Sequence, residues 1–216
     1  MVARSYNGRM RDYLTGAAGA PVLLLAHGAG AGEDHPWMTR VAAGLAERGI
    51  RVRTFNFPYR EAGRRLPDPG AVLEAAIGSA WEELVTSTPG ARVRVAGGKS
   101  MGGRIASQLA ARRGFHPAPA GLVFFGYPLH PPGKPGQRRD RHLPSLSDPM
   151  LFLHGSRDPF GTPDEMRDLT RGLPGATLEL IDDGDHSLVA PKRTDPAGAS
   201  VRTALDRAAA WMLSLG

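Results

Sequence analysis

The sequence predicts an α/β domain built on a mostly parallel sheet of about six to seven strands, with helices on both faces. Two observations support this fold class. Short apolar runs alternate with longer amphipathic stretches along the whole chain, and several of the runs are apolar without a break. Strands covered by helices on both sides lack the polar–apolar alternation of half-exposed strands. The 216 residues fit one domain, residues 1–216, that is long enough to bury a core without disulfides or metals.

The strands are predicted from six apolar runs. These are residues 22–26, 52–57, 93–96, 122–125, 150–153 and 178–181. A hairpin turn at Tyr6-Asn7-Gly8-Arg9 would add one or two antiparallel edge strands near the N-terminus, because Asn-Gly favours tight two-residue turns.

Five helices are predicted between and after these runs. They cover residues 37–47, 71–85, 101–113, 163 to about 171, and 199–215. Gly49 and Gly114 follow two of them as stop signals. Pro69 is expected at the first helical position, where its missing N–H has no cost. Thr162 and Glu165 form a capping box that begins the fourth helix.

Residues 128–149 are proline-rich and basic, and they show no periodicity. A connection of this length is typical of a functional loop or of an excursion over the edge of the sheet. Its densest basic stretch, residues 134–142, also holds an aspartate and lies among prolines, which favours a solvated loop over a polyanion site. Nucleic-acid binding through Arg138, Arg139 and Arg141 is a further alternative that this pattern does not favour, so no nucleic-acid partner is expected.

The composition excludes several classes of protein. The chain has no cysteine, which rules out disulfide scaffolds, thiolate zinc sites and a cysteine nucleophile. Lys and Arg number 27 against 21 Asp and Glu, but this net charge of +6 is spread evenly along the chain. No signal-peptide core follows the N-terminus, and the apolar run at residues 21–26 is far shorter than a membrane span. We therefore expect a cytoplasmic protein with no membrane partner, as a monomer or homodimer.

The candidate chemistry follows the strands, because ligands bind at the carboxyl ends of strands in an open parallel sheet. Gly98, Ser100 and Gly102 form a Gly-x-Ser-x-Gly pattern between a predicted strand and a predicted helix. In so tight a turn, larger side chains at the glycine positions would collide with the backbone, and the serine oxygen would project above the sheet. The helix N-terminus directs partial positive charge at the same place. The pattern predicts a catalytic serine rather than a structural turn.

A glycine-rich turn, HGAGAG, occupies residues 27–32 after the first long apolar run. We expect the backbone N–H groups of Met101 and Ala29 to form an oxyanion hole, with Gly30 as the alternative to Ala29. A phosphate-binding loop is the competing interpretation, but the glycine spacing differs from that of dinucleotide-binding loops and no Walker lysine follows. His27 is expected to be a structural group bonded to nearby backbone.

An aspartate and a histidine follow two later strands. Asp158 comes after the run at residues 150–153, and His186 lies on the loop after the last run. Asp158 is preferred over Asp182, Asp183 and Asp185 as the partner of His186, because a side chain one residue away rarely points at its neighbour's imidazole. The chain order Ser…Asp…His is that of α/β-hydrolases.

The segments HGAG, GGKSMGGR, HGSRDPFG and GDHSL together resemble the α/β-hydrolase superfamily, and within it the small dienelactone-hydrolase-like serine hydrolases. Residues 126–134 with His142-Leu143-Pro144 resemble a subgroup whose eukaryotic relatives include a testis-expressed protein and a subunit of a histone acetyltransferase complex. The resemblance implies an α/β-hydrolase fold and cleavage of an ester, thioester or lactone bond. Dienelactone hydrolases proper use a cysteine nucleophile, which this chain lacks, so their substrate is not implied.

The resulting hypothesis is a serine hydrolase acting on a small acyl substrate, without cofactor or metal. His186 would take the proton of Ser100, Asp158 would orient the imidazole, and an acyl-enzyme would form and be hydrolysed. No insertion is long enough for a large lid domain, so an open, shallow site is expected, with residues 128–149 as the candidate cover. The alternative is a catalytically weak binding or scaffold protein that keeps the fold.

Three further residues are candidate substrate-binding groups beside Gly30. Lys99 could steer anionic substrates, although a side chain directed to solvent is the favoured expectation. Tyr127 and His130 either border the pocket for the acyl or leaving group or belong to a rigid connection, and the sequence does not separate these two possibilities.

Overall fold

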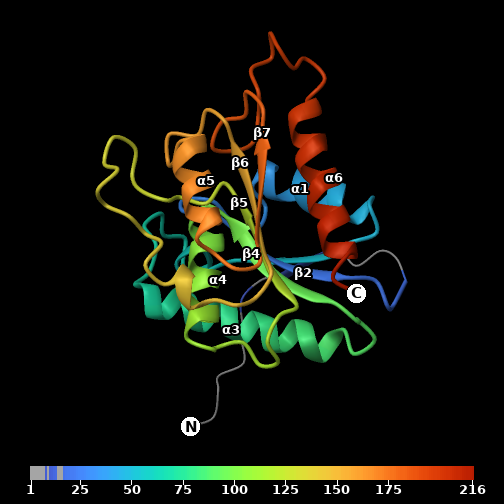
Figure 1. The fold of residues 1–216 in the computed structure, drawn as a ribbon. Coiled ribbons are helices and arrows are strands. Elements are labelled where there is room, and N and C mark those ends of the chain that lie inside the picture. Colours follow the sequence, from blue (N-terminus) through green and yellow to red (C-terminus); the bar gives the residue numbers. More distant parts are fainter. Residues whose placement is uncertain (1–7, 9, 14–16) are drawn as a thin grey trace.

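The computed structural model describes residue 8, residues 10–13 and residues 17–216. In this part of the chain, seven strands form one sheet in the order β1-β3-β2-β4-β5-β6-β7 (Figure 1). The strands are β1 (Met10–Tyr13), β2 (Val22–Ala26), β3 (Arg51–Phe55), β4 (Arg94–Lys99), β5 (Gly121–Phe125), β6 (Met150–Gly155) and β7 (Ala176–Ile181). The strand β1 is antiparallel to β3, and the other described pairs are parallel. The predicted mostly parallel sheet is confirmed.

Six helices and a short 3-10 helix surround this sheet in the described residues. They are α1 (Pro36–Ala46), α2 (Pro58–Glu61), α3 (Gly70–Ser87), α4 (Met101–Ala111), α5 (Pro163–Arg171) and α6 (Ala199–Leu213), with the 3-10 helix at Leu143–Ser145. The five predicted helices are present, and the predicted capping box of Thr162 and Glu165 is formed. The short helix α2 was not predicted. Pro69 is the N-cap of α3 rather than its first residue, because its ψ of 150° lies outside the helical range.

The two faces of the sheet bury two separate apolar clusters. Along β2, Val22, Leu24 and Ala26 belong to the cluster that includes residues of α3, α4 and α5, whereas Leu23 and Leu25 belong to the cluster that includes residues of α1 and α6. Helices α5 and α6 accordingly lie on opposite sides of β6 and β7 (Figure 1). Because both faces of the sheet are buried, the strand sequences are continuous apolar runs without polar alternation.

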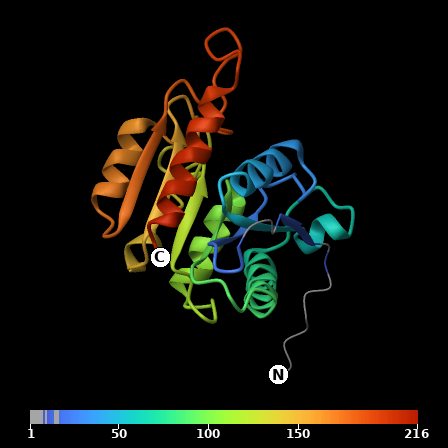
Figure 2. The ribbon, with the colours of Figure 1, turned by 90° about the vertical axis from the view of Figure 1, so that its right-hand side faces the viewer.

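The N-terminal elements form one end of the sheet and the C-terminal elements form the other (Figure 2). Strand β1 is an antiparallel edge strand near the N-terminus, as predicted, and Asp12 on it pairs with Arg53 on β3. The proposed turn at residues 6–9 lies outside the described residues, apart from Gly8.

Residues 128–149 form the long connection between β5 and β6 and carry the 3-10 helix. Residues 132–138 of this loop are exposed, and no described segment is large enough to build a separate lid. Across the described residues, no helix combines the length and the apolar character needed to cross a membrane.

Candidate active site

Ser100 stands at the sharp turn between β4 and α4. Its φ of 50° and ψ of −114° lie outside the usual regions for an L-residue, a conformation that costs about 1–3 kcal/mol. The turn is possible because Gly98 and Gly102 have no side chains: a Cβ at either position would overlap the carbonyl oxygen of Ala26 on β2. The close packing of this strand–turn–helix unit therefore holds the serine in its strained position.

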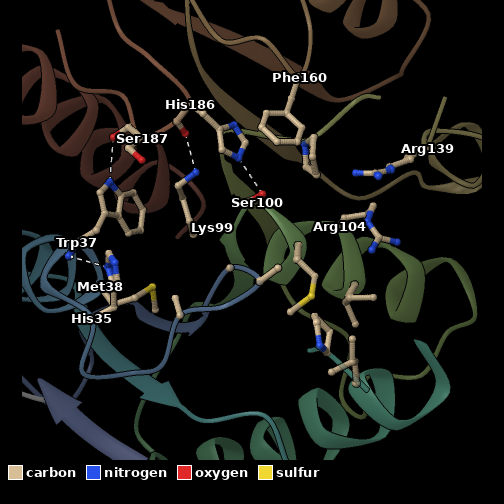
Figure 3. A pocket seen from close by; sticks show the side chains of 18 of the residues that line it. His35, Trp37, Met38, Lys99, Ser100, Arg104, Arg139, Phe160, His186 and Ser187 are labelled. Carbon is tan, nitrogen blue, oxygen red and sulfur yellow. Dashed lines mark hydrogen bonds between the residues drawn. The ribbon is translucent and has the colours of Figure 1, made fainter. Parts of the chain in front are cut away.

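His186 lies within hydrogen-bond distance of Ser100 (Figure 3). It lies similarly close to Asp158. The distance from Ser100 Oγ to His186 Nε2 is 2.8 Å, and that from His186 Nδ1 to Asp158 Oδ2 is 2.7 Å. With the Nδ1–H donating to the carboxylate, Nε2 is left to accept the serine proton. The ring of Phe160 stacks on the imidazole with centroids 4.2 Å apart. The structure thus brings together the three side chains that the sequence analysis selected.

The environment of Asp158 keeps its carboxyl group ionised. Burial alone raises the pKa of this carboxyl, but the hydrogen bond and charge of His186, the charge of His154 and the N–H of Phe160 together hold the pKa below its usual value. The Phe160 N–H donates to Oδ1 at 2.9 Å. A carboxylate that stays charged can stabilise the imidazolium that forms when His186 takes a proton.

His154 is a further buried group beside Asp158 that the sequence analysis missed. Its Nε2–H donates to the carbonyl oxygen of Gly161 at 2.8 Å, and its Nδ1 lies 3.7 Å from Asp158 Oδ2. Burial lowers the pKa of this imidazole. The bond to Gly161 connects the end of β6 to the far side of the turn that carries Asp158.

The other three carboxylates near His186 in the sequence are directed elsewhere. Asp185 Oδ1 accepts the N–H groups of Ser187 and Val189 and so shapes the loop. Asp183 accepts from the hydroxyl of Thr194 at 3.0 Å, and Asp182 is exposed.

The glycine-rich turn at residues 27–32 lies against the serine. A Cβ placed on Gly28 would be 3.6 Å from the Cβ of Ser100. Ala29 and Met101 both belong to the wall of the cavity described below, whereas Gly30, with a φ of 73°, lies outside it. Met101 is the first residue of α4, so its N–H has no carbonyl one turn earlier in the helix to bind.

His27 is a buried structural group in this turn. Its Nδ1–H donates to the carbonyl oxygen of Gly28 at 2.8 Å, and its Nε2 accepts the N–H of Phe57 at 3.1 Å. Burial lowers the pKa of His27 to about 4, so the ring is neutral near pH 7. It joins the turn to the segment after β3.

A cavity of about 590 Å³ opens beside Ser100 (Figure 3). This volume is typical of pockets for small ligands. Its apolar wall comes from Trp37, Met38, Leu73, Met101, Ile105 and Phe160. Residues 67–73, before and at the start of α3, form part of this wall, a contribution that the sequence analysis missed because it depends on how α3 packs.

Lys99 does not point to solvent, so the favoured expectation for this residue was wrong. Its Nζ donates to the carbonyl oxygen of His186 at 2.6 Å and lies 5.7 Å from the centre of the Trp37 ring. The Trp37 Nε1–H donates to the next carbonyl, that of Ser187, at 2.9 Å. Burial lowers the pKa of Lys99 to about 8, although Asp158 and Asp185 oppose the shift. These partners replace water around the ammonium group.

Tyr127 and His130 do not line the cavity, so of the two possibilities left open by the sequence the structure fits a rigid connection and not a pocket border. The Tyr127 hydroxyl donates to the carbonyl of Arg139 at 2.9 Å, and the His130 ring lies 2.8 Å from the Pro131 carbonyl and 3.2 Å from Glu165. Both side chains are buried and hold the loop in place. From residues 128–149, the cavity is lined instead by Pro128 and Arg139.

The described residues contain no group of three or more His, Cys, Asp or Glu side chains arranged to hold a metal ion.

Comparison with known proteins agrees with this architecture. The family model described as an alpha/beta hydrolase domain matches residues 19–214. Among solved structures, a dienelactone hydrolase from Anabaena variabilis is 21% identical, with a TM-score of 0.71, and the match covers 92% of this chain and 88% of that one.

Two further structures are similar in fold. A serine hydrolase without a lid from Xanthomonas campestris is 18% identical, with a TM-score of 0.64, over 89% of this chain and 82% of that one. A monoacylglycerol lipase from Paleococcus ferrophilus is 17% identical, with a TM-score of 0.70, over 97% of this chain and 100% of that one. At these identities the likeness shows the fold.

Proposed function

The chain belongs to the alpha/beta hydrolase domain family, and from this premise we propose that it is a serine hydrolase that cleaves an ester, thioester or lactone bond of a small acyl substrate. One observation carries the proposal: Ser100, His186 and Asp158 form a continuous hydrogen-bonded series with distances of 2.8 and 2.7 Å beside a ligand-sized cavity. A serine hydroxyl is a weak nucleophile by itself, and an adjacent base that is held by a third group activates it.

The first half of the proposed reaction forms an acyl-enzyme. Ser100 Oγ attacks the substrate carbonyl while its proton passes to His186 Nε2, and Asp158 stabilises the imidazolium. The N–H groups of Met101 and Ala29 bind the negative charge on the former carbonyl oxygen, where one such donor contributes about 3 kcal/mol. Collapse of the intermediate breaks the bond to the leaving oxygen or sulfur, which takes the proton from His186.

The second half returns the serine. A water molecule gives a proton to His186 Nε2 as its oxygen attacks the acyl carbonyl. The new intermediate expels Ser100 Oγ, which recovers its proton from the imidazolium, and the carboxylic acid leaves. The ring of Phe160 covers one face of the imidazole throughout and limits its contact with solvent.

The test is covalent labelling by a fluorophosphonate together with hydrolysis of a panel of nitrophenyl esters and thioesters of varying acyl length. We expect the Ser100→Ala variant to lose labelling and to lower kcat/KM by roughly 10⁴-fold or more. The matched control is Ser145→Ala, an exposed serine in the loop of residues 128–149.

Labelling that persists in Ser100→Ala would contradict the assignment. A wild-type protein that is neither labelled nor active on any substrate would favour the alternative of a binding or scaffold protein with the same fold.

We also propose the finer resemblance to the subgroup with testis-expressed and histone acetyltransferase complex relatives. It rests on the stretches around Tyr127 and His142. In this structure the Tyr127 hydroxyl donates to the Arg139 carbonyl, and the His142 ring is hydrogen-bonded to Ser107 Oγ on α4 at 2.7 Å. These residues of the two stretches therefore attach the loop to the fold.

A further inference from the structure

Two arginines lie on the cavity wall on the side of Ser100 opposite Lys99 and Trp37 (Figure 3). Arg104 comes from α4, four residues after Ser100, and Arg139 comes from the loop of residues 128–149. Four residues of helix correspond to about 6 Å along the axis. A group bound by these arginines would therefore lie a few bonds from a carbonyl held at Ser100.

Neither guanidinium forms an ion pair within the described part of the chain. Arg104 Nη1 donates to the amide oxygen of Gln108 at 3.3 Å, but its Nε is buried with no acceptor. Glu74 is the carboxylate whose charge acts on Arg104, yet it pairs with Arg112 at 3.3 Å.

Arg139 is held by its backbone and not by its side chain. Its N–H donates to the Leu129 carbonyl at 2.8 Å, and its carbonyl accepts the hydroxyl of Tyr127 at 2.9 Å. Among the described residues, no hydrogen bond of its guanidinium is found. The backbone is thus fixed while the five N–H donors of the side chain stay available.

The proximity of the two arginines is unfavourable in the free protein. Burial and the charge of Arg139 both lower the pKa of the Arg104 guanidinium. Two like charges beside an apolar wall repel each other, and a buried donor without an acceptor has a desolvation cost. A single anion placed between them would offset both effects, because guanidinium groups bind carboxylates and phosphates through paired hydrogen bonds.

Three other polar side chains of the cavity wall, those of Lys99, His35 and Asp68, each have a partner within the protein. Lys99 donates to the His186 carbonyl at 2.6 Å, and His35 accepts the N–H of Trp37 at 3.2 Å. Asp68 Oδ1 pairs with Arg64 at 2.6 Å, whereas its Oδ2 is buried without a hydrogen-bond partner.

We propose that Arg104 and Arg139 bind a carboxylate or phosphate group of the substrate, so that the enzyme acts on anionic acyl esters or thioesters. This inference rests on the proposed function, since it describes the substrate of the same site. The anionic group and the reacting carbonyl occupy one cavity, with the apolar residues Met101 and Ile105 on the wall beside them.

The kinetic test compares esters in neutral and anionic pairs. On the acyl side, the pair is 4-nitrophenyl pentanoate and mono-4-nitrophenyl glutarate. On the alcohol side, phenyl butyrate is compared with the butyrate esters of 4-hydroxybenzoate and of 4-hydroxyphenyl phosphate. These comparisons show whether the site prefers a carboxylate or a phosphate, and whether the preferred anion lies on the acyl group or on the leaving group.

We expect at least one anionic ester to be preferred over its neutral counterpart by about tenfold or more in kcat/KM. Arg104→Gln and Arg139→Gln should each reduce that preference about tenfold, mainly through KM. Arg141→Gln is the matched control, because it removes the same charge from an exposed position in the same loop, and it should leave the preference unchanged.

Anion binding by Arg104 and Arg139 can also be measured without any ester hydrolysis. Glutarate and inorganic phosphate are titrated by calorimetry into Ser100→Ala, with and without Arg104→Gln, and thermal unfolding checks that each variant is folded. Binding of either anion that weakens about tenfold or more in the double variant supports the site even if no ester is hydrolysed. If neither anion binds, or if neutral esters are preferred in every arm, the inference is overturned while labelling of Ser100 still supports the proposed function.

Discussion

Lys99 and Arg104 flank Ser100, line the same cavity and carry the same charge, yet their surroundings differ. Lys99 Nζ donates to the His186 carbonyl at 2.6 Å and lies over the Trp37 ring, whereas Arg104 has a buried Nε with no acceptor. Because Lys99 binds the backbone of His186, it helps to fix the position of the imidazole. A cation with unused donors is available to a ligand. The difference separates the side of the cavity that positions the imidazole from the side that we propose binds substrate.

The side of the cavity formed by Lys99 and Trp37, here called the positioning side, is connected by hydrogen bonds to the loop that carries His186. Lys99 and Trp37 hold the carbonyls of His186 and Ser187, and Asp158 holds the imidazole itself. Changes on this side should therefore lower kcat for every substrate alike, whereas changes at Arg104 and Arg139 should alter which substrates are preferred.

The largest effect on the positioning side is expected for Asp158→Asn. The amide cannot stabilise the imidazolium, and it favours the wrong tautomer of His186, so kcat should fall by about 10⁴-fold for neutral and anionic esters equally. Steady-state kinetics on both kinds of ester measure this. Asp183→Asn, which changes a carboxylate bound to Thr194, is the control and should stay within about twofold of wild type. The reverse result, with Asp183→Asn inactive and Asp158→Asn active, would show that the wrong carboxylate was chosen.

An intermediate effect is expected for Lys99→Met. The change removes a charged donor from the His186 carbonyl, and hydrogen bonds to charged groups contribute about 1.5–3 kcal/mol. If this bond holds the imidazole within reach of Ser100, kcat should fall by about 10- to 100-fold with no change in the preference for anionic esters. Lys134→Met, in an exposed part of the loop, is the matched control. If Lys99→Met reduced the preference for anionic over neutral esters as much as is expected for Arg104→Gln, Lys99 would also bind substrate and the proposed difference between the two cations would be wrong.

The pH profile sharpens the same prediction. Burial lowers the pKa of Lys99 to about 8, so the ammonium is charged below that pH and becomes a neutral amine above it. A neutral amine donates a weaker hydrogen bond, and wild-type kcat should decline about fivefold as the pH rises through 8. Lys99→Met should show a low kcat without this decline.

The smallest effect is expected for Trp37→Phe. Phenylalanine keeps most of the ring but cannot donate to the Ser187 carbonyl, and a neutral hydrogen bond contributes about 1 kcal/mol. A decrease in kcat of about fivefold is expected, again for both kinds of ester. An effect as large as that of Asp158→Asn would mean that Trp37 contacts the reacting groups and does not simply support the loop.

The expected proximity of Ser100, Asp158 and His186, which the structure shows, depends on local sequence and on the topology of the sheet. The strand–turn–helix unit around Ser100 follows from Gly98 and Gly102, because no larger residue fits against Ala26. The positions of Asp158 and His186 follow from a topological rule, since the carboxyl ends of parallel strands meet at one edge of the sheet. The hydrogen bonds among the three side chains also depend on the loop of His186, whose carbonyl and that of Ser187 are held by Lys99 and Trp37.

The parts that were missed depend on contacts between distant segments. The direction of Lys99 is determined by the carbonyl of His186, 87 residues later in the chain, and no residue next to Lys99 in the sequence indicates this contact. Tyr127 and His130 lie near the site in the sequence, but their side chains turn away toward the loop that they hold. The proximity of Arg104 and Arg139 likewise arises from the path of residues 128–149 over α4.

Periodicity, glycine placement and strand-end chemistry were enough to predict the sheet, its helices and the turn at Ser100, because each signal lies within a few residues of the feature it specifies. The choice of His186 also needed the chain order Ser…Asp…His of α/β-hydrolases, which is not a local signal. Tertiary packing decided the directions of the side chains and the composition of the cavity wall. It also decided that Lys99 binds a backbone carbonyl while Arg104 keeps a donor without an acceptor. Those features depend on which donors and acceptors from remote segments come within about 3 Å of one another, and that information does not exist until the chain has folded.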